Sequence, residues 1–375
     1  MPGEPGFFLG VTMGGSSVSK DMLDEYTRYT GRRLAFISIF IVIVILLFFI
    51  SLSVGTRDLS IGEVYELFIN HLSGVTYDRH EEYQLWFDDN IIWNYRVPRA
   101  CFAIIAGATL SVAGSTMQSV MKNPLADPYT TGISSGALLG VAVAMVLGFT
   151  VGGAGINGYG TILNAMLFSM IPVVMIIALG PYMNSSPSTL ILAGTAVSYL
   201  FSSLTSILLV TTDEETLATV YRWQVGHFGD LSWDAIPFAL ISCIIGSLII
   251  MALSNKLNLM SLDDKDAKAL GLDGEKLRIL CLVILSFMAA SIISYVGIIG
   301  FVGLIVPHMV RMVIGSDNRF VIPASMFFGG AFLLGCDIIS RGLDVSAMIP
   351  VGVITSFIGA PIFLYLIVKN KKGVW

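Results

Sequence analysis

The sequence predicts an all-α polytopic membrane protein with about ten transmembrane helices. Of its 375 residues, 55% are hydrophobic and only 13% are charged, and the mean hydropathy is +0.81. A soluble globular domain carries about 25% charged residues, so much of this chain must face lipid. The net charge is −5 and no basic stripe stands out, so we expect no nucleic-acid partner.

Ten apolar stretches are long enough, or nearly so, to cross a bilayer. The stretch 279–314 is too long for one helix across a core of about 30 Å, and Gly297, Gly300 and Gly303 predict a hairpin there. The first run follows a polar N-terminal tail, 1–33, and is longer than the apolar region of a signal peptide, so we expect it to stay as a span. The spans lie near 34–54, 100–121, 131–149, 161–180, 189–210, 237–254, 279–296, 299–314, 321–336 and 345–368.

The distribution of Lys and Arg orients these spans. An even number of spans places both termini on one side of the membrane. With the termini inside, fifteen Lys and Arg residues fall on the cytoplasmic side and six outside, which satisfies the positive-inside rule. The sequence therefore predicts cytoplasmic termini, a single transmembrane domain over 34–375, and outer loops at 55–99 and 211–236.

The predicted spans contain almost no ionisable groups, the exceptions being His308 and Arg311 near an inner end. Ion-driven carriers usually need a buried Asp, Glu or Lys, so the composition argues against a secondary carrier. No phosphate-binding loop of the G-x-x-x-x-G-K-[ST] type is present, so any ATP should be bound by a partner. No nucleophile, carboxylate pair or metal-ligand spacing indicates an enzyme or a metal site.

Two local patterns suggest close packing and a stiff turn. Small residues at four-residue spacing, Ala103, Gly107, Ser111 and Ser115, form one stripe that packs within the chain or against a second copy. The run 122–128 contains Pro124 and Pro128 with Asn123 and Asp127, which predicts a rigid inner turn able to hold a gate.

Several motifs together resemble the FecCD family of permeases. In the first half these are Arg96-Val97-Pro98-Arg99, Asn123 through Pro128, and Gly132 through Ala137. The second half contributes Gly300 through His308, Arg311, Asp337 through Arg341, and Pro350 through Val353. The resemblance covers roughly 34–368. The chain departs from the family in having Met348-Ile349 where an acidic residue is usual, and in its long 55–95 loop.

The resemblance implies the permease subunit of an ATP-binding-cassette importer for iron–siderophores, haem or cobalamin, in the cytoplasmic membrane of a prokaryote. An iron–siderophore is favoured because it is the family's commonest substrate. The implied partners are a second permease copy or a paralogue, two ATPase subunits that bind the ATP, and an extracytoplasmic substrate-binding protein. The chain itself would bind no cofactor and would not be an enzyme. The alternative is an ion-coupled secondary transporter.

The resemblance also implies roles for particular residues. Arg96, Arg99 and Arg341 would dock acidic residues of the binding protein, although arginines at helix ends also serve as plain anchors. The segment 255–278 would be the coupling segment, with Asp266, Ala267, Leu270 and Gly271 against the ATPase. We expect Gly271 to end one short helix and a second short helix to follow from Asp273 or Gly274. Gate and turn residues would be Asn123, Pro124, Asp127, Pro128, Pro307 and His308, with His308 mainly structural.

Overall fold

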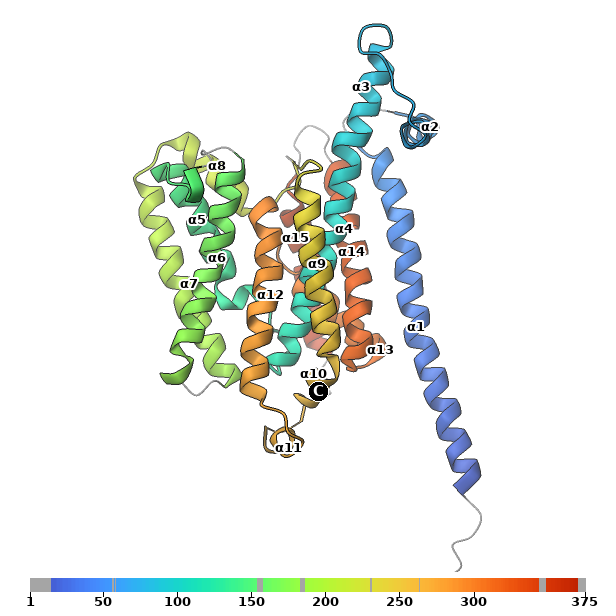
Figure 1. Ribbon diagram of the computed structural model, residues 1–375, viewed down its shortest axis with the longest axis vertical. Helices are drawn as coiled ribbons and strands as arrows, with labels where there is room; N and C mark the ends of the chain where they lie inside the picture. Colours follow the sequence, from blue (N-terminus) through green and yellow to red (C-terminus); the bar gives the residue numbers. More distant parts are fainter. Residues whose placement is uncertain are drawn as a thin grey trace, which may run out of the picture.

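The computed structural model is a bundle of helices that run roughly parallel to one another (Figure 1). The structure describes residues 15–55, 57, 59–153, 158–182, 186–229, 231–262, 264–343 and 349–369. All regular structure in these ranges is helical. The predicted fold class is therefore confirmed.

The described helices include ten that match the ten predicted spans. Seven are long and apolar enough to cross a membrane, and the other three are shorter apolar helices, Ile133–Leu147, Val302–Ile314 and Val351–Leu366. The break between Val296 and Val302 confirms the predicted hairpin. The ten are α1 (Gly15–Ser53), α4 (Val97–Val120), α5 (Ile133–Leu147), α6 (Tyr159–Leu179), α7 (Pro187–Val210), α9 (Ala235–Ala252), α12 (Gly274–Val296), α13 (Val302–Ile314), α14 (Asn318–Leu343) and α15 (Val351–Lys369).

Shorter helices occupy the connections. The predicted outer loop 55–99 contains α2 (Ile61–Leu72) and α3 (Tyr83–Ile91), and α3 runs through a π-helical turn, η1 (Ile92–Arg96), into α4. The others are α8 (Glu214–Gln224), α10 (Ser254–Leu259), α11 (Asp264–Ala269) and the 3₁₀ turns η2 (Pro128–Thr131), η3 (Val151–Gly153) and η4 (Gly180–Tyr182). Helix α1 already begins at Gly15, so the later half of the predicted tail 1–33 continues the first span, while residues 1–14 lie outside the described ranges.

The core of the bundle is α4, which is buried along nearly its whole length against α14, α12, α13 and α9. Glycines make this packing close. A Cβ added at Gly107 would lie 2.1 Å from the Gly329 carbonyl oxygen of α14, and one at Gly114 would lie 1.9 Å from that of Gly303 on α13. The small-residue stripe on α4 therefore packs inside this chain, as one of its two interpretations predicts.

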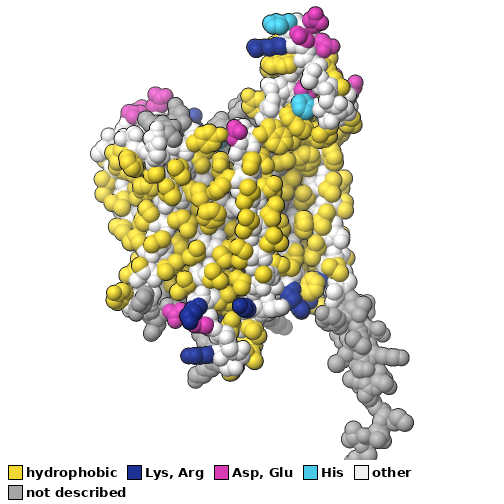
Figure 2. Space-filling model, viewed as in Figure 1, with side chains coloured by type: hydrophobic (Ala, Val, Ile, Leu, Met, Phe, Trp, Pro, Cys, Tyr) yellow, Lys and Arg dark blue, Asp and Glu magenta, His cyan; other side chains and the backbone are white. Residues whose placement is uncertain are grey.

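Charged side chains gather at the two ends of the bundle, with a hydrophobic band between them (Figure 2). On the face in view, Lys and Arg dominate the end that carries α11, whereas Asp, Glu and His are more frequent at the opposite end. This distribution agrees with the orientation that the charge count predicts, with α11 on the cytoplasmic side.

Candidate docking, gating and coupling sites

The three predicted docking arginines converge on one cavity of about 450 Å³ at the outer end of the bundle. Arg96 and Arg99 reach it from the start of α4, and Arg341 from the last turn of α14. His227 and Pro350 also line it. Residues far apart in the sequence thus form one basic outer site.

Two of these arginines hold the end of α1. Arg96 is 5% exposed and donates from Nη1 to the Leu52 carbonyl (2.7 Å) and from Nη2 to the Arg57 carbonyl (2.8 Å). Arg341 donates to the carbonyls of Ser51 and Val54. The last carbonyls of a helix lack intrahelical partners and carry partial negative charge, so two guanidinium groups suit them well. Arg96 and Arg341 therefore fasten the end of α1 to α4 and α14, and their docking role stays a prediction.

Arg99 pairs with a carboxylate that the hydropathy pattern placed outside the spans. Its Nε and Nη2 donate to Asp337 Oδ1 at 2.9 and 2.8 Å, and Arg341 Nη2 lies 3.0 Å from Asp337 Oδ2. The Asp337 side chain is fully buried, whereas that of Arg99 is 22% exposed. Of the three arginines, Arg99 is the best placed to meet a partner's carboxylate.

This pairing corrects the prediction that only His308 and Arg311 are ionisable within the spans. Helix α14 continues past Cys336 to Leu343, so Asp337 and Arg341 lie inside it. Arg278 is likewise buried in α12. The reason is that their partners lie elsewhere in the fold, where a window of local hydropathy cannot register them: Asp337 pairs with Arg99 of α4 as well as with Arg341 of its own helix, and Arg278 donates to the Val120 carbonyl of α4 (3.3 Å).

The predicted gate residues 123–128 form a tight turn between α4 and α5. These residues and Lys122 are together called the gate turn. Asn123 Oδ1 accepts from the Leu125 amide (2.9 Å), and Asp127 Oδ1 caps η2 by accepting from the Tyr129 amide (2.8 Å). The Tyr129 hydroxyl donates to the Ile299 carbonyl (3.0 Å), just before α13. The turn is thus stiff and is bonded, through Tyr129, to the segment that leads into α13, the helix that carries the other predicted gate residues, Pro307 and His308, both buried.

The coupling segment projects from the cytoplasmic end as α10 and α11. Gly271 has φ +81° and the Leu272 amide donates to the Ala267 carbonyl (3.0 Å), which confirms Gly271 as the helix stop. The helix that follows from Gly274, with Asp273 as N-cap, is α12 itself, so the predicted second short helix is wrong. The reason is that the cap opens directly onto an apolar run that continues for the full span.

The residues predicted to contact the ATPase divide into exposed and buried ones. Leu270 is 62% exposed, and Asp266 and Gly271 are also exposed. Ala267, by contrast, is 4% exposed because it packs with Leu257, Met260 and Leu272 against α4, α9 and α12. Beside them lies a cavity of about 630 Å³ that Met260, Lys268 and Arg278 help to line. Leu270 and its neighbours thus present an apolar contact on a rigid base.

Asp337, the partner of Arg99 and Arg341, and Asn258 of the coupling segment could not be recognised from the sequence, because neither stands in a local pattern that signals its contacts. No metal centre emerges either, since the described residues contain no group of three His, Cys, Asp or Glu side chains arranged to hold an ion.

Several known permeases are similar in sequence to this chain. An ABC transporter permease protein of Methanocaldococcus jannaschii is 37% identical over 94% of this chain and 100% of its own length. The molybdate import permease of Haemophilus influenzae is 33% identical over 86% of this chain and 92% of its own. The cobalamin import permease of Halobacterium salinarum is 36% identical over 74% and 73%, respectively.

Among solved structures, a metal-chelate type ABC transporter in an inward-facing conformation matches with a TM-score of 0.76 and 30% identity. The match covers 89% of this chain and 98% of that one. The profile of the FecCD transport family matches residues 43–369, nearly the whole membrane-embedded bundle. The chain therefore belongs to the FecCD transport family.

Proposed function

We propose that this chain is the permease subunit of an ATP-binding-cassette importer that takes up a metal chelate, an iron–siderophore in the first instance. It works as a dimer of two permease copies, or with a paralogue, in the cell membrane of a prokaryote. An extracytoplasmic binding protein delivers the chelate, and two separate ATPase subunits bind and hydrolyse ATP. The chain itself carries no cofactor and no catalytic residue.

The observation that carries this proposal is the exposed leucine on a rigid, charged cytoplasmic projection. Leu270 stands 62% exposed at the end of α11, flanked by the exposed Lys268 and Gly271. An apolar side chain at the centre of a charged rim is the usual composition of a protein contact. The base beneath it is packed into the membrane bundle through Ala267 and Leu272, so a force applied at Leu270 reaches the spans.

The structure also weakens the alternative of an ion-coupled secondary transporter. Such a carrier needs a carboxylate free to bind and release the coupling ion. Within the described spans Asp337 is fixed between Arg99 and Arg341, and at the inner turn Asp127 is engaged in capping η2. These carboxylates serve packing and helix capping.

For the outer face we propose that Arg99 makes the principal contact with the binding protein. Arg96 and Arg341 complete the basic cavity while holding α1. A docking carboxylate would approach Arg99 from the exposed side of its guanidinium group. Such rim charges steer association more than they add affinity, so docking should weaken as salt rises.

Reconstitution in proteoliposomes tests the proposal. The permease is combined with a candidate ATPase and binding protein from the same organism, and uptake of iron-55 siderophore, haem, cobalamin and molybdate is measured with and without internal ATP. We expect ATP-dependent uptake of an iron chelate that requires the binding protein and survives collapse of ion gradients. Uptake driven by an ion gradient in liposomes without the ATPase would refute the proposed function. Uptake of molybdate alone would show that molybdate, and not a metal chelate, is the substrate.

A further inference from the structure

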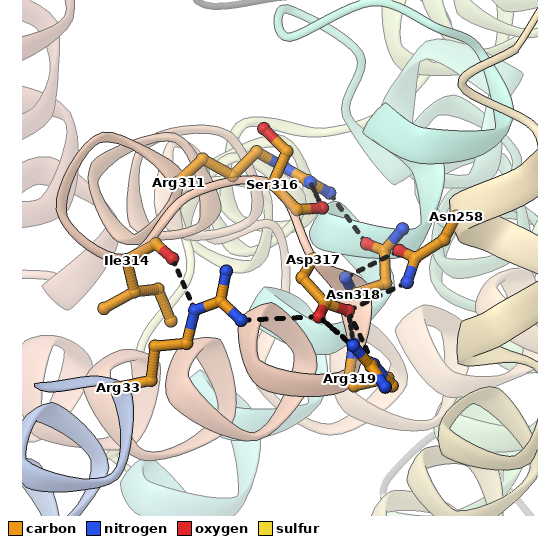
Figure 3. Close-up of polar contacts among 8 residues, drawn as sticks. All are labelled: Arg33, Asn258, Arg311, Ile314, Ser316, Asp317, Asn318 and Arg319. Atoms are coloured by element: carbon orange, nitrogen blue, oxygen red, sulfur yellow. Dashed lines mark hydrogen bonds and ion pairs between the residues drawn. The ribbon is translucent and has the colours of Figure 1, made fainter. Parts of the chain in front are cut away.

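A polar network at the inner end of the bundle connects the coupling segment to the last turn of α4, next to the gate turn. Figure 3 shows the part of this network around the α13–α14 connection. Its members come from α1, α10, α13, α14 and α4, which are remote from one another in the sequence. They occupy the α13–α14 connection and the last turns of α4. The sequence indicated that Arg311 lies near an inner end, but it predicted none of these contacts.

The network begins at Asn258 on α10. Its Nδ2 donates to Asp317 Oδ1 (2.8 Å), and its Oδ1 accepts from the Asn318 backbone amide (2.8 Å). Both the nitrogen and the oxygen of the Asn258 side-chain amide are therefore hydrogen-bonded at the start of α14. Because rotation of the side chain would break both bonds, Asn258 fixes the direction as well as the distance between α10 and α14.

From α14 the network continues to α4. Asn318 Oδ1 accepts from Ser119 Oγ (2.9 Å) and from Arg311 Nη2 (3.2 Å). Arg311 Nη2 also donates to the Ser115 carbonyl (3.0 Å) and to Ser119 Oγ (2.8 Å). Asn318 and Arg311 are each 3% exposed. Helix α4 ends at Val120, so the network grips the last turn before the gate turn.

The α13–α14 connection is held from the opposite side as well. Asp317 Oδ2 pairs with Arg319 (2.7 Å) and with Arg33 of α1 (3.4 Å), and Arg33 Nε donates to the Ile314 carbonyl (3.0 Å). Figure 3 shows Asp317 with Arg33 on one side and Asn258 on the other. The connection is thus clamped between α1 and α10, which leaves it little freedom to absorb a movement of α10.

A second, direct contact joins the same two segments. Lys122 Nζ of the gate turn donates to the Leu262 carbonyl of the coupling segment (2.8 Å). Both residues are exposed, so water competes for this bond and a flexible lysine can follow a displaced carbonyl. The connection through Asn258 has less of that freedom, because its first two bonds are part-buried and its next members, Asn318 and Arg311, are buried, so water replaces a broken bond there less readily. Of the two connections, the one through Asn258 is the less able to absorb a displacement.

We propose that Asn258 is a positioning residue of the transport cycle: through Asn318 and Arg311 it transmits movement of the coupling segment to the last turn of α4 and the gate turn. This inference rests on the proposed function, because it assumes that an ATPase moves the coupling segment. It assigns a role in energy coupling to a set of side chains that link α10, α13, α14 and α4 within this chain.

The test uses the complete transporter in proteoliposomes and measures ATP hydrolysed per substrate imported. Asn258→Ala should leave assembly and ATP hydrolysis in place but raise this ratio about tenfold, because two hydrogen bonds at the first step are lost. Asn255→Ala is the matched control, an exposed asparagine on the same helix, and should stay within about twofold of wild type. An unchanged ratio in an assembled Asn258→Ala transporter would overturn the inference.

A double-mutant cycle separates transmission from local damage. Ser119 does not touch Asn258, yet both contact Asn318. If they act in one network, Ser119→Ala with Asn258→Ala should raise the ratio no further than Asn258→Ala alone, whereas multiplied effects would show independent sites and overturn the inference. If Asn258→Ala fails to assemble, Ser119→Ala alone carries the test, and an unchanged ratio again counts against it. A wild-type transporter without ATP-driven uptake would instead refute the proposed function.

Discussion

Removing the carboxylate of Asp337 should destabilise the permease strongly. In the structure Asp337 is fully buried and lies 2.8 Å from Arg99 Nη2 and 3.0 Å from Arg341 Nη2. Deleting one partner of a buried ion pair costs about 3–5 kcal/mol because the remaining charge is left without compensation. Arg99 is 22% exposed and can recover some hydration, so we expect about 3 kcal/mol for Asp337→Ala.

The free energy of unfolding can be measured by denaturant titration of the purified permease in detergent. Asp337→Asn should cost less than Asp337→Ala, because the amide oxygen still accepts the two hydrogen bonds from Arg99. Asp234→Asn, an exposed outer carboxylate, is the control and should change stability by less than about 0.5 kcal/mol. If Asp337→Ala unfolds as Asp234→Asn does, the ion pairs contribute nothing and the reasoning fails.

Four other changes follow from the structure. Leu270→Asp should reduce co-purification of the ATPase subunits without altering permease stability, since the side chain is 62% exposed; undiminished co-purification would exclude it from the contact. Gly114→Ala should lower the folded yield, with a cost of about 1–3 kcal/mol or more, because its Cβ would lie 1.9 Å from the Gly303 oxygen; a wild-type unfolding curve would contradict this. Arg99→Glu should weaken binding-protein association most at low salt and should also lower stability, because it removes a partner of the buried Asp337, whereas Arg96→Met should lower stability with little loss of association; equal losses of association would assign docking to both. Finally, burial alone would raise the pKa of Asp317, but hydrogen bonds from Arg319 and Asn258 outweigh it and lower the pKa to about 2. The charged Asp317 contributes fully to stability above pH 3.8, and this contribution is lost as the pH falls toward 2. We therefore expect titration of Asp317 to cause no change in the ATP used per imported substrate between pH 5 and 8. A step in this ratio within that pH range that Asp317→Asn abolishes would refute the expectation.

Much of the fold follows from local sequence. Apolar length predicted ten spans, three glycines predicted the α12–α13 hairpin, and Gly271 predicted the end of α11, because each of these depends on residues close together in the chain. The contacts of the outer site could not be predicted in this way. Asp337 and Arg99 are 238 residues apart, and neither position reveals the other.

The coupling segment shows the same limit on a smaller scale. Its mixed charge and its glycine stop predicted a projecting helix, which the structure has. The pattern did not reveal that Ala267 faces inward while Leu270 faces outward, because that depends on the packing of Leu257, Met260 and Leu272 in one cluster with α4, α9, α12 and α14. Nor could it separate Asn258 from Asn255, two asparagines of one helix, since only the position of α14 gives Asn258 its two partners.

The outer and inner networks meet in α14. This helix runs unbroken for 26 residues, about 39 Å, with Asn318 at its inner end and Asp337 near its outer end. It is fastened to α1 at both ends, through Arg341 outside and Arg33 inside, and ring contacts between Phe40 and Phe328 join the two helices between these points. A packed helix pair shifts as a unit more readily than it bends, so a docked protein that displaced Arg99 and Asp337 would also shift the inner end of α14 next to Asn258. If docking signals by this path, Asn258→Ala should reduce stimulation of ATP hydrolysis by the binding protein even though the substitution lies at the opposite face of the membrane. Full stimulation in that variant would confine the role of Asn258 to the inner face.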